Sequence, residues 1–259
     1  MKQAAPHPRI LYEHPFSEGV RTMLRLEHLL DRLARLIERD EALDHHFALQ
    51  TLFEVQDLAS RADLKTELLK ELERHKAQYQ GYRGHPEISE ASLDALIARI
   101  DTAVGELQAA PAVRSGASPG HDVLSSVRNR IGIAGGTCCF DLPGYHAWQH
   151  LAGAQRRADL VSWIEPLAPL AQALALQLGL LRDSGMSQRV RATAGQFQQK
   201  LPDTRTWHLL RLHIDADLGL VPEISGQRSL VSVRLLRFDT DGRLKPVAED
   251  ADFDLTLCA

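Results

Sequence analysis

Residue types that are common in active sites are concentrated in the stretch 131–150. Two adjacent cysteines, Cys138 and Cys139, follow a pair of glycines, and His146 and His150 stand one helical turn apart. Cysteine and histidine are ligands that Zn²⁺ prefers, and a thiolate beside an imidazole can form a nucleophile–base pair. Adjacent glycines can also hold a phosphate against backbone N–H groups. The stretch therefore has the residue types for metal binding, thiol catalysis or phosphate binding.

The spacing argues against all three chemistries. Neighbouring side chains on an extended segment point to opposite faces, so Cys138 and Cys139 would reach one metal ion only through a special turn. The histidines are spaced as in H-E-x-x-H, but Ala147 removes the general base of that motif. Residues 140–143 separate the cysteines from the next helix N-terminus, and the glycine pair lacks the other residues of a phosphate-binding loop.

We therefore expect no catalytic, metal or cofactor site, and we expect both cysteines to be buried as small apolar residues. The alternative is a metal- or thiol-dependent enzyme. It would use Cys138, Cys139, His146 and His150.

A second candidate site is a row of basic residues on the first predicted helix. They are spaced three or four apart, which puts them on one face: Arg21, Arg25, His28, Arg32, Arg35 and Arg39. Such a face is either a solvated surface balanced by nearby acidic residues or a docking surface for an acidic segment, because Arg forks onto carboxylates. The same two interpretations apply to Arg128 and Arg130, which would enlarge the basic surface. Trp148 and Tyr145 are either binding aromatics or core residues of a short helix.

Length and composition narrow the class of protein. The 259 residues can bury a large core, and the net charge of −4 argues against general nucleic-acid binding. Three cysteines, an odd number, fit a reducing cytosol better than a disulfide framework. The N-terminal residues lack the apolar core of a signal peptide. The apolar run 170–181 is too short to cross a bilayer, so we expect a buried core helix there.

Apolar periodicity divides the chain into a helical part followed by a strand-rich part. Residues three and four apart predict helices over about 17–39, 41–59, 63–79, 90–108, 122–131, 144–156 and 159–183. Ser17 suits the N-cap of the first helix, and Glu18 suits its first turn. After Thr206 the period changes to two, which predicts strands over 210–214, 229–238 and 253–257. Residues 239–242 have the composition of a turn between strands.

These elements predict an α+β fold. We expect a mainly helical N-terminal and central part with a C-terminal antiparallel β-domain. The strand-like residues 10–13 need a partner, so we expect the N-terminal strand to join that C-terminal sheet. The expected domains are a helical domain of 16–134 and 144–185, and a β-domain of 10–15, 135–143 and 200–259.

Seven sequence blocks in order resemble the ZapD family of bacterial cell-division proteins, and they cover nearly the whole chain. The blocks are LYEHP at 11–15, RTMLRLE at 21–27, TELLKEL at 66–72, GG at 135–136 with CFDLP at 139–143, HAWQHL at 146–151, ISG at 224–226 and DFDL at 252–255. Each block alone is weak, but their common order is specific. Ala134 and Asp122 depart from the family pattern, which has a proline and a basic residue at these positions.

The resemblance implies a cytoplasmic homodimer that acts in septation at midcell and is not an enzyme. Members of the family bind the C-terminal tail of the tubulin-like GTPase FtsZ and crosslink its filaments, which promotes Z-ring assembly. No cofactor, nucleic-acid partner or membrane insertion is implied. The partner-binding residues of the family fall here on Arg25 and His146, and four further residues suit the same role: Arg21, Arg128, Arg130 and Trp148. At Asp122 one cationic contact of the family is in doubt.

Overall fold

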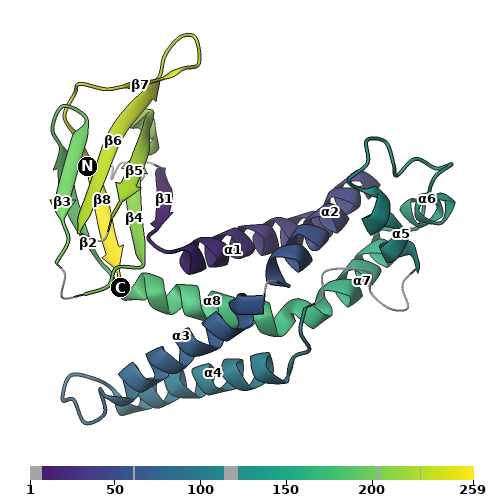
Figure 1. The fold of residues 1–259 in the computed structure, drawn as a ribbon, viewed down its shortest axis with the longest axis horizontal. Helices are drawn as coiled ribbons and strands as arrows, with labels where there is room; N and C mark the ends of the chain where they lie inside the picture. The colour runs from purple at the N-terminus through teal and green to yellow at the C-terminus, as the bar shows by residue number, and fades with distance from the viewer. Residues whose placement is uncertain (1–7, 61, 114–121, 203–204, 228) are drawn as a thin grey trace, which may run out of the picture. The chain divides into compact units, whose positions relative to one another are not determined.

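The computed structural model describes residues 8–259 except 61, 114–121, 203–204 and 228, and it divides the chain into two compact units (Figure 1). The helical unit is Thr22–Gln177. The β unit combines Met1–Arg21 with Leu178–Ala259. Helices and antiparallel sheets thus occupy separate parts of the chain, which confirms the α+β class.

Eight α-helices lie among the described residues, together with a 3-10 turn, η1 (Glu165–Leu167). The helices are α1 (Glu18–Ile37), α2 (Ala42–Ala59), α3 (Ala62–Gln80), α4 (Glu90–Ala109), α5 (Asp122–Arg130), α6 (Pro143–Gln149), α7 (Gly153–Ile164) and α8 (Ala168–Asp183). The first five agree with the prediction to within two residues at each end.

Helix α1 begins where the sequence predicts it. The Ser17 hydroxyl accepts a hydrogen bond from the Val20 N–H at 3.3 Å, which satisfies one of the free donors of the first turn. The apolar stripe of the helix is buried, with Met23 at 1% and Leu26 at 0% exposure. Burial of this stripe, more than intrinsic propensity, holds the helix in place.

The helix boundaries predicted around residue 150 are wrong. The expected helix over 144–156 ends at Gln149, and α7 begins at Gly153. The Arg156 side chain donates hydrogen bonds to the carbonyls of Gln149 and Leu151, so these carbonyls are satisfied without a continuous helix. Apolar periodicity cannot predict these hydrogen bonds, because their donor is the charged side chain of Arg156.

Among the described residues, one helical run is long and apolar enough to be a candidate membrane span. It is Gly153–Asp183, formed by α7, η1 and α8, and 44% of its apolar 18-residue segment is buried inside the protein. A core helix meets the same criteria of length and composition, so the run is weak evidence for membrane insertion.

The β unit contains two antiparallel sheets. The strands are β1 (Arg9–Pro15), β2 (Met186–Ala192), β3 (Gln196–Lys200), β4 (Leu209–Asp215), β5 (Leu220–Gly226), β6 (Leu230–Phe238), β7 (Leu244–Pro246) and β8 (Ala251–Cys258). Sheet A has the order β1-β4-β8-β2, and sheet B has the order β3-β6-β5 with β7 paired to β6. Strand β1 pairs with β4, with Tyr12 opposite Leu212, which confirms that the N-terminal strand joins the C-terminal sheet.

Apolar side chains from both sheets form one core cluster in the β unit. It includes Leu212 and Ile214 of sheet A and Val231, Val233 and Leu235 of sheet B, all at most 1% exposed. The three predicted strands supply most of this cluster. Strands β2 and β3 escaped prediction because they are edge strands whose residues are mostly polar and exposed.

The turn predicted over 239–242 connects β6 and β7. The Asp239 carboxylate accepts hydrogen bonds from the N–H groups of Asp241 and Arg243, both at 2.9 Å. Gly242 takes a φ of 75°, a conformation that favours glycine.

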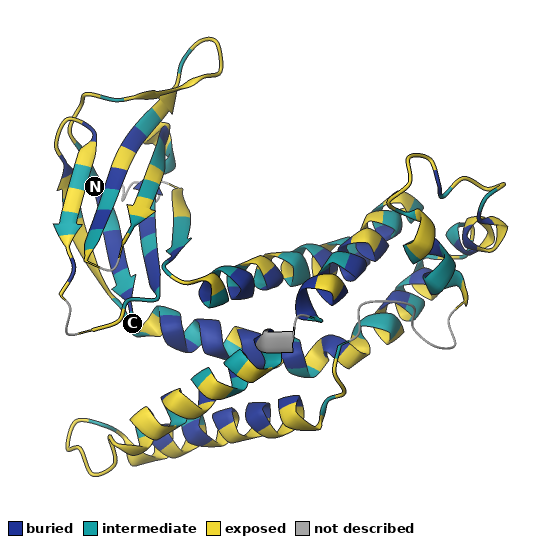
Figure 2. Cartoon of the chain, in the orientation of Figure 1, coloured by how far each residue is buried: buried dark blue, intermediate teal, exposed yellow. Residues whose placement is uncertain are grey.

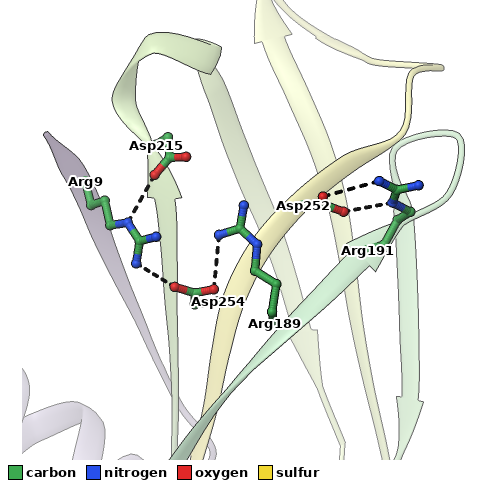
Figure 3. A network of polar contacts seen from close by, with 6 residues as sticks. All are labelled: Arg9, Arg189, Arg191, Asp215, Asp252 and Asp254. Atoms are coloured by element: carbon green, nitrogen blue, oxygen red, sulfur yellow. Dashed lines mark hydrogen bonds and ion pairs between the residues drawn. The ribbon is translucent and has the colours of Figure 1, made fainter. Parts of the chain in front are cut away.

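Charged residues on sheet A form a ladder that crosses all four strands (Figure 3). Arg9 donates to Asp215 at 3.1 Å and to Asp254 at 2.5 Å, while Arg189 donates to the other oxygen of Asp254 at 3.1 Å. Arg191 bonds to Asp252 at 2.8 Å, and this hydrogen bond lowers the pKa of the Asp252 carboxyl. Exposed pairs of this kind contribute little individually, but the ladder opposes any slip of strand register.

The division into units differs from the expected domains at three segments. Residues 16–21 and 178–185, which the sequence analysis assigned to the helical domain, lie in the β unit. Residues 135–143, which the sequence analysis assigned to the β-domain, lie within the helical unit. They connect α5 to α6 through consecutive turns rather than a strand, and the Leu142 side chain is buried at 8% exposure. The stretch 131–150 is therefore internal to the helical unit.

Glu13 of β1 holds two arginines in the β unit, and this cluster generates a first prediction. One carboxylate oxygen accepts from Arg182 at 2.9 Å and from Arg211 at 3.1 Å, and the other accepts from Arg182 at 2.8 Å. The three side chains are between 16% and 24% exposed. Glu13→Gln should lower the free energy of unfolding by about 2 kcal/mol, because it removes the carboxylate that both partly buried guanidinium groups share. Urea unfolding followed by circular dichroism measures this.

Glu223→Gln is the matched control. Glu223 pairs with Arg234 at 3.3 Å in the same unit, but both side chains are more than half exposed. Its loss should cost less than about 1 kcal/mol. Equal effects of the two substitutions would show that the Glu13 cluster has no special role.

Candidate protein-binding surface

The basic face of α1 is largely balanced by acidic partners within the chain. Arg21 pairs with Glu18 at 3.2 Å, and Arg35 pairs with Asp31 at 2.9 Å on the same helix. Arg32 reaches Glu54 of α2 at 2.5 Å. An acidic partner would have to exchange with these carboxylates, so the net energy available from charge alone is small.

Arg25 and His28 lie on the same face of α1 and are both exposed. Arg25 stands one helical turn after Arg21, as the spacing predicts. Arg39 falls outside this face, because α1 ends at Ile37. The exposed guanidinium of Arg25 is therefore placed where a carboxylate in solution can reach it.

Arg128 is mostly buried and packs within the helical unit. Its guanidinium donates to Gln56 at 2.9 Å, pairs with Asp57, and lies 5.0 Å above the centre of the Phe53 ring. Only 14% of its side chain is exposed. This arrangement joins α5 to α2 and leaves little of the cation accessible to a partner.

Arg130, two residues later, is more accessible. It pairs with Asp141 at 3.1 Å, with 46% of the arginine and 30% of the aspartate side chain exposed. This pair spans the connection between α5 and α6. Arg130 can therefore exchange Asp141 for an external carboxylate at small cost.

The residues of α6 divide into an exposed side and a buried side. His146 is exposed, and its ring lies 4.5 Å from that of His150, whose Nδ1 contacts the His146 carbonyl at 2.8 Å. Trp148 is 6% exposed, and its indole N–H donates to Asp159 at 2.8 Å. Tyr145 is 1% exposed and stacks on Trp148. Trp148 and Tyr145 thus have the core packing that was the alternative to a binding role.

The expected burial of the two adjacent cysteines is wrong. Cys138 and Cys139 are both exposed, whereas Cys258 is buried. The connection between α5 and α6 consists of consecutive turns, and most of its residues are exposed (Figure 2). Across the described residues, no group of three or more His, Cys, Asp or Glu side chains is placed to hold a metal ion.

The position of α6 depends on Arg156, which the sequence analysis did not single out. This buried guanidinium bonds to the carbonyls of Asp40, Gln149 and Leu151, and to Nδ1 of His45 at 3.0 Å. It thereby ties the segment between α1 and α2 to the end of α6. Arg156 stands beside another arginine, Arg157, in a polar stretch, so the sequence contains no signal for its burial.

Substitution of Arg156 provides a second prediction. Arg156→Met should lower the free energy of unfolding by about 3 kcal/mol, because three part-buried carbonyls lose their charged donor. Arg157→Met is the control, since Arg157 pairs with Asp40 at the surface and should contribute less than about 1 kcal/mol. Thermal and urea unfolding of both variants compare them directly. Similar losses would contradict the role assigned to Arg156.

His46 gives the helical unit a predicted dependence on pH. Its Nδ1 lies 2.9 Å from the Tyr145 hydroxyl, and burial lowers the pKa of its ring. Because the unfolded chain binds a proton near pH 6.5 and the folded chain only at lower pH, stability should fall as pH drops below about 6.5.

Replacement of His46 by a residue that does not titrate should remove its contribution to the pH dependence of stability. In His46→Asn, the loss of unfolding free energy between pH 7.5 and 5.5 should be smaller than in the wild type. Unfolding curves at several pH values measure the slope. An unchanged slope would show that other groups cause the pH dependence.

Comparison with known proteins identifies the kind of protein that carries this surface. A family model described as "ZapD: Cell division protein" matches residues 24–234. Proteins named cell division protein ZapD are similar to this chain at 47% identity in Ralstonia nicotianae, 46% in Ralstonia pickettii and 43% in Cupriavidus pinatubonensis. Each comparison covers 250 residues, which are 96% of this chain and 99% of the relative.

These matches define a bacterial cell-division protein. The chain belongs to the ZapD family, as the seven sequence blocks predicted. The names of the relatives describe a role in cell division and indicate no catalytic activity.

Proposed function

We propose that this protein binds the C-terminal tail of FtsZ and, as a homodimer, crosslinks FtsZ filaments in the cytoplasm at midcell. The observation that carries the proposal is membership of the ZapD family over nearly the full length of the chain. Exposed Arg25 and His146, the positions that match the family's binding residues, support it.

The physical requirements of filament crosslinking agree with this assignment. A flexible tail loses conformational freedom when it binds, so a single tail on one protomer is held weakly. Two sites on one dimer convert the second binding event into an intramolecular one, which raises the overall affinity without any new contact. Weak individual sites, such as largely balanced ion pairs, are therefore sufficient for crosslinking a polymer.

The proposal assigns no chemical step to the protein. The alternative enzyme would need Cys138, Cys139, His146 and His150 to act together, and in the described part of the chain both cysteines lie in exposed turns rather than in a buried pocket. Elemental analysis of protein purified without added zinc separates the two hypotheses. Near-stoichiometric metal would favour the enzyme.

Cosedimentation with FtsZ polymers tests the proposed function. The protein should pellet with intact FtsZ and remain in the supernatant with FtsZ that lacks its C-terminal tail. Arg25→Ala combined with His146→Ala should weaken binding about thirtyfold, because exposed interface side chains of this kind contribute about 1 kcal/mol each. The thermal midpoint should change little, since both side chains are exposed.

Arg99→Ala combined with His85→Ala is the matched control. Both residues are exposed in the helical unit, and the substitution changes charge in the same way. It should leave cosedimentation unchanged. Equal pelleting with intact and tail-deleted FtsZ would refute tail binding.

A further inference from the structure

The connection between α5 and α6 presents two large apolar side chains to solvent. Phe140 is 80% exposed and Ile133 is 54% exposed. Burial of an exposed aromatic ring against a partner is favourable, and exposed apolar patches rimmed by polar residues mark interaction sites. We propose that Phe140, supported by Ile133, is the apolar anchor for the acidic and apolar tail segment that this protein binds. This inference rests on the proposed function.

The loop that carries Phe140 is held by its own backbone. In successive turns, the Ile133 N–H donates to the Arg130 carbonyl at 2.9 Å, and the Gly136 N–H donates to the Ile133 carbonyl at 2.9 Å. The N–H groups of Asp141 and Leu142 both bond to the Cys138 carbonyl, at 3.0 and 2.9 Å. The backbone around Phe140 is therefore fixed before any partner arrives, which reduces the entropy lost on binding.

Gly136 shows how tightly this loop is folded. A Cβ at this position would lie 2.7 Å from the Arg130 carbonyl oxygen and 2.8 Å from the Ile133 Cβ. Leu142, at 8% exposure, anchors the end of the loop in the core. The loop thus buries Gly136 and Leu142 and exposes the Phe140 side chain.

The charged residues next to Phe140 and Ile133 in the chain indicate which kind of partner would bind there. Arg130 stands just before the loop and pairs with Asp141 at its end, and exposed His146 follows on α6. Because the Arg130 pair is already made, an acidic partner gains little from charge alone, and burial of the Phe140 ring supplies the larger favourable term. The surface fits a peptide that has aliphatic or aromatic residues beside a carboxylate.

Fluorescence anisotropy with a labelled FtsZ C-terminal tail peptide tests this anchor without the avidity of filaments. Phe140→Ala should raise the dissociation constant at least about tenfold, as expected for an aromatic anchor. Phe140→Leu should restore part of the affinity. Phe238→Ala, which removes another exposed phenylalanine (60%) in the β unit, should leave the constant unchanged.

The native cysteines provide an independent measurement. Cys138 and Cys139 immediately precede Phe140 and are exposed, whereas Cys258 is 0% exposed. Saturating tail peptide should slow alkylation of the 138–139 thiols by N-ethylmaleimide at least about fivefold, as read by mass spectrometry. An unchanged alkylation rate overturns the inference.

The outcomes separate this inference from the proposed function. If the wild type binds the peptide and Phe140→Ala binds it equally well, the anchor is wrong and tail binding stands. If the wild type does not bind the peptide, the proposed function fails and the inference fails with it. A change in sedimentation coefficient for Phe140→Ala, with peptide affinity unchanged, would assign the loop to contact with a second copy and overturn the inference.

Discussion

The helical unit depends on one buried cation. Arg156 satisfies carbonyls from three places in the sequence, at Asp40, Gln149 and Leu151, and it reaches His45 of α2 as well. A guanidinium can do this because its donors are rigid, planar and always charged. Without it, the part-buried carbonyls at the end of α6 and between α1 and α2 would lose a charged donor. Arg156 thereby helps to hold the end of α6, the helix that carries His146.

Charged and apolar side chains have different roles at the candidate binding surface. The row of basic residues on α1 stands out in the sequence, yet most of its members meet carboxylates in the same chain. Paired surface charges guide orientation and rate of association more than they add affinity. On the loop between α5 and α6, the side chain of Phe140 is 80% exposed. Recognition of a tail would then combine charges that orient it with an apolar side chain that retains it.

Much of this architecture follows from periodicity in the sequence. The apolar stripes of α1 to α4 and the alternation in β4, β6 and β8 predict those elements, because their burial patterns repeat. The edge strands β2 and β3 have few buried residues, and their pairing depends on distant partners. Apolar periodicity also does not reveal the break between α6 and α7, because that break is stabilised by the charged side chain of Arg156. The exposure of Cys138 and Cys139 follows from turns that only the folded chain displays.

The β unit is built from both ends of the chain, and this has a consequence for synthesis. Strand β1 emerges first from the ribosome, but its partner β4 is made much later, with Arg9 and Asp215 separated by 206 positions. The helical unit between them can fold while translation continues, because its contacts lie within Thr22–Gln177. Strand β1 has no pairing partner in the sheet until β4 has been synthesised. A truncated chain would therefore carry a folded helical unit without a β unit, and only complete chains would have both.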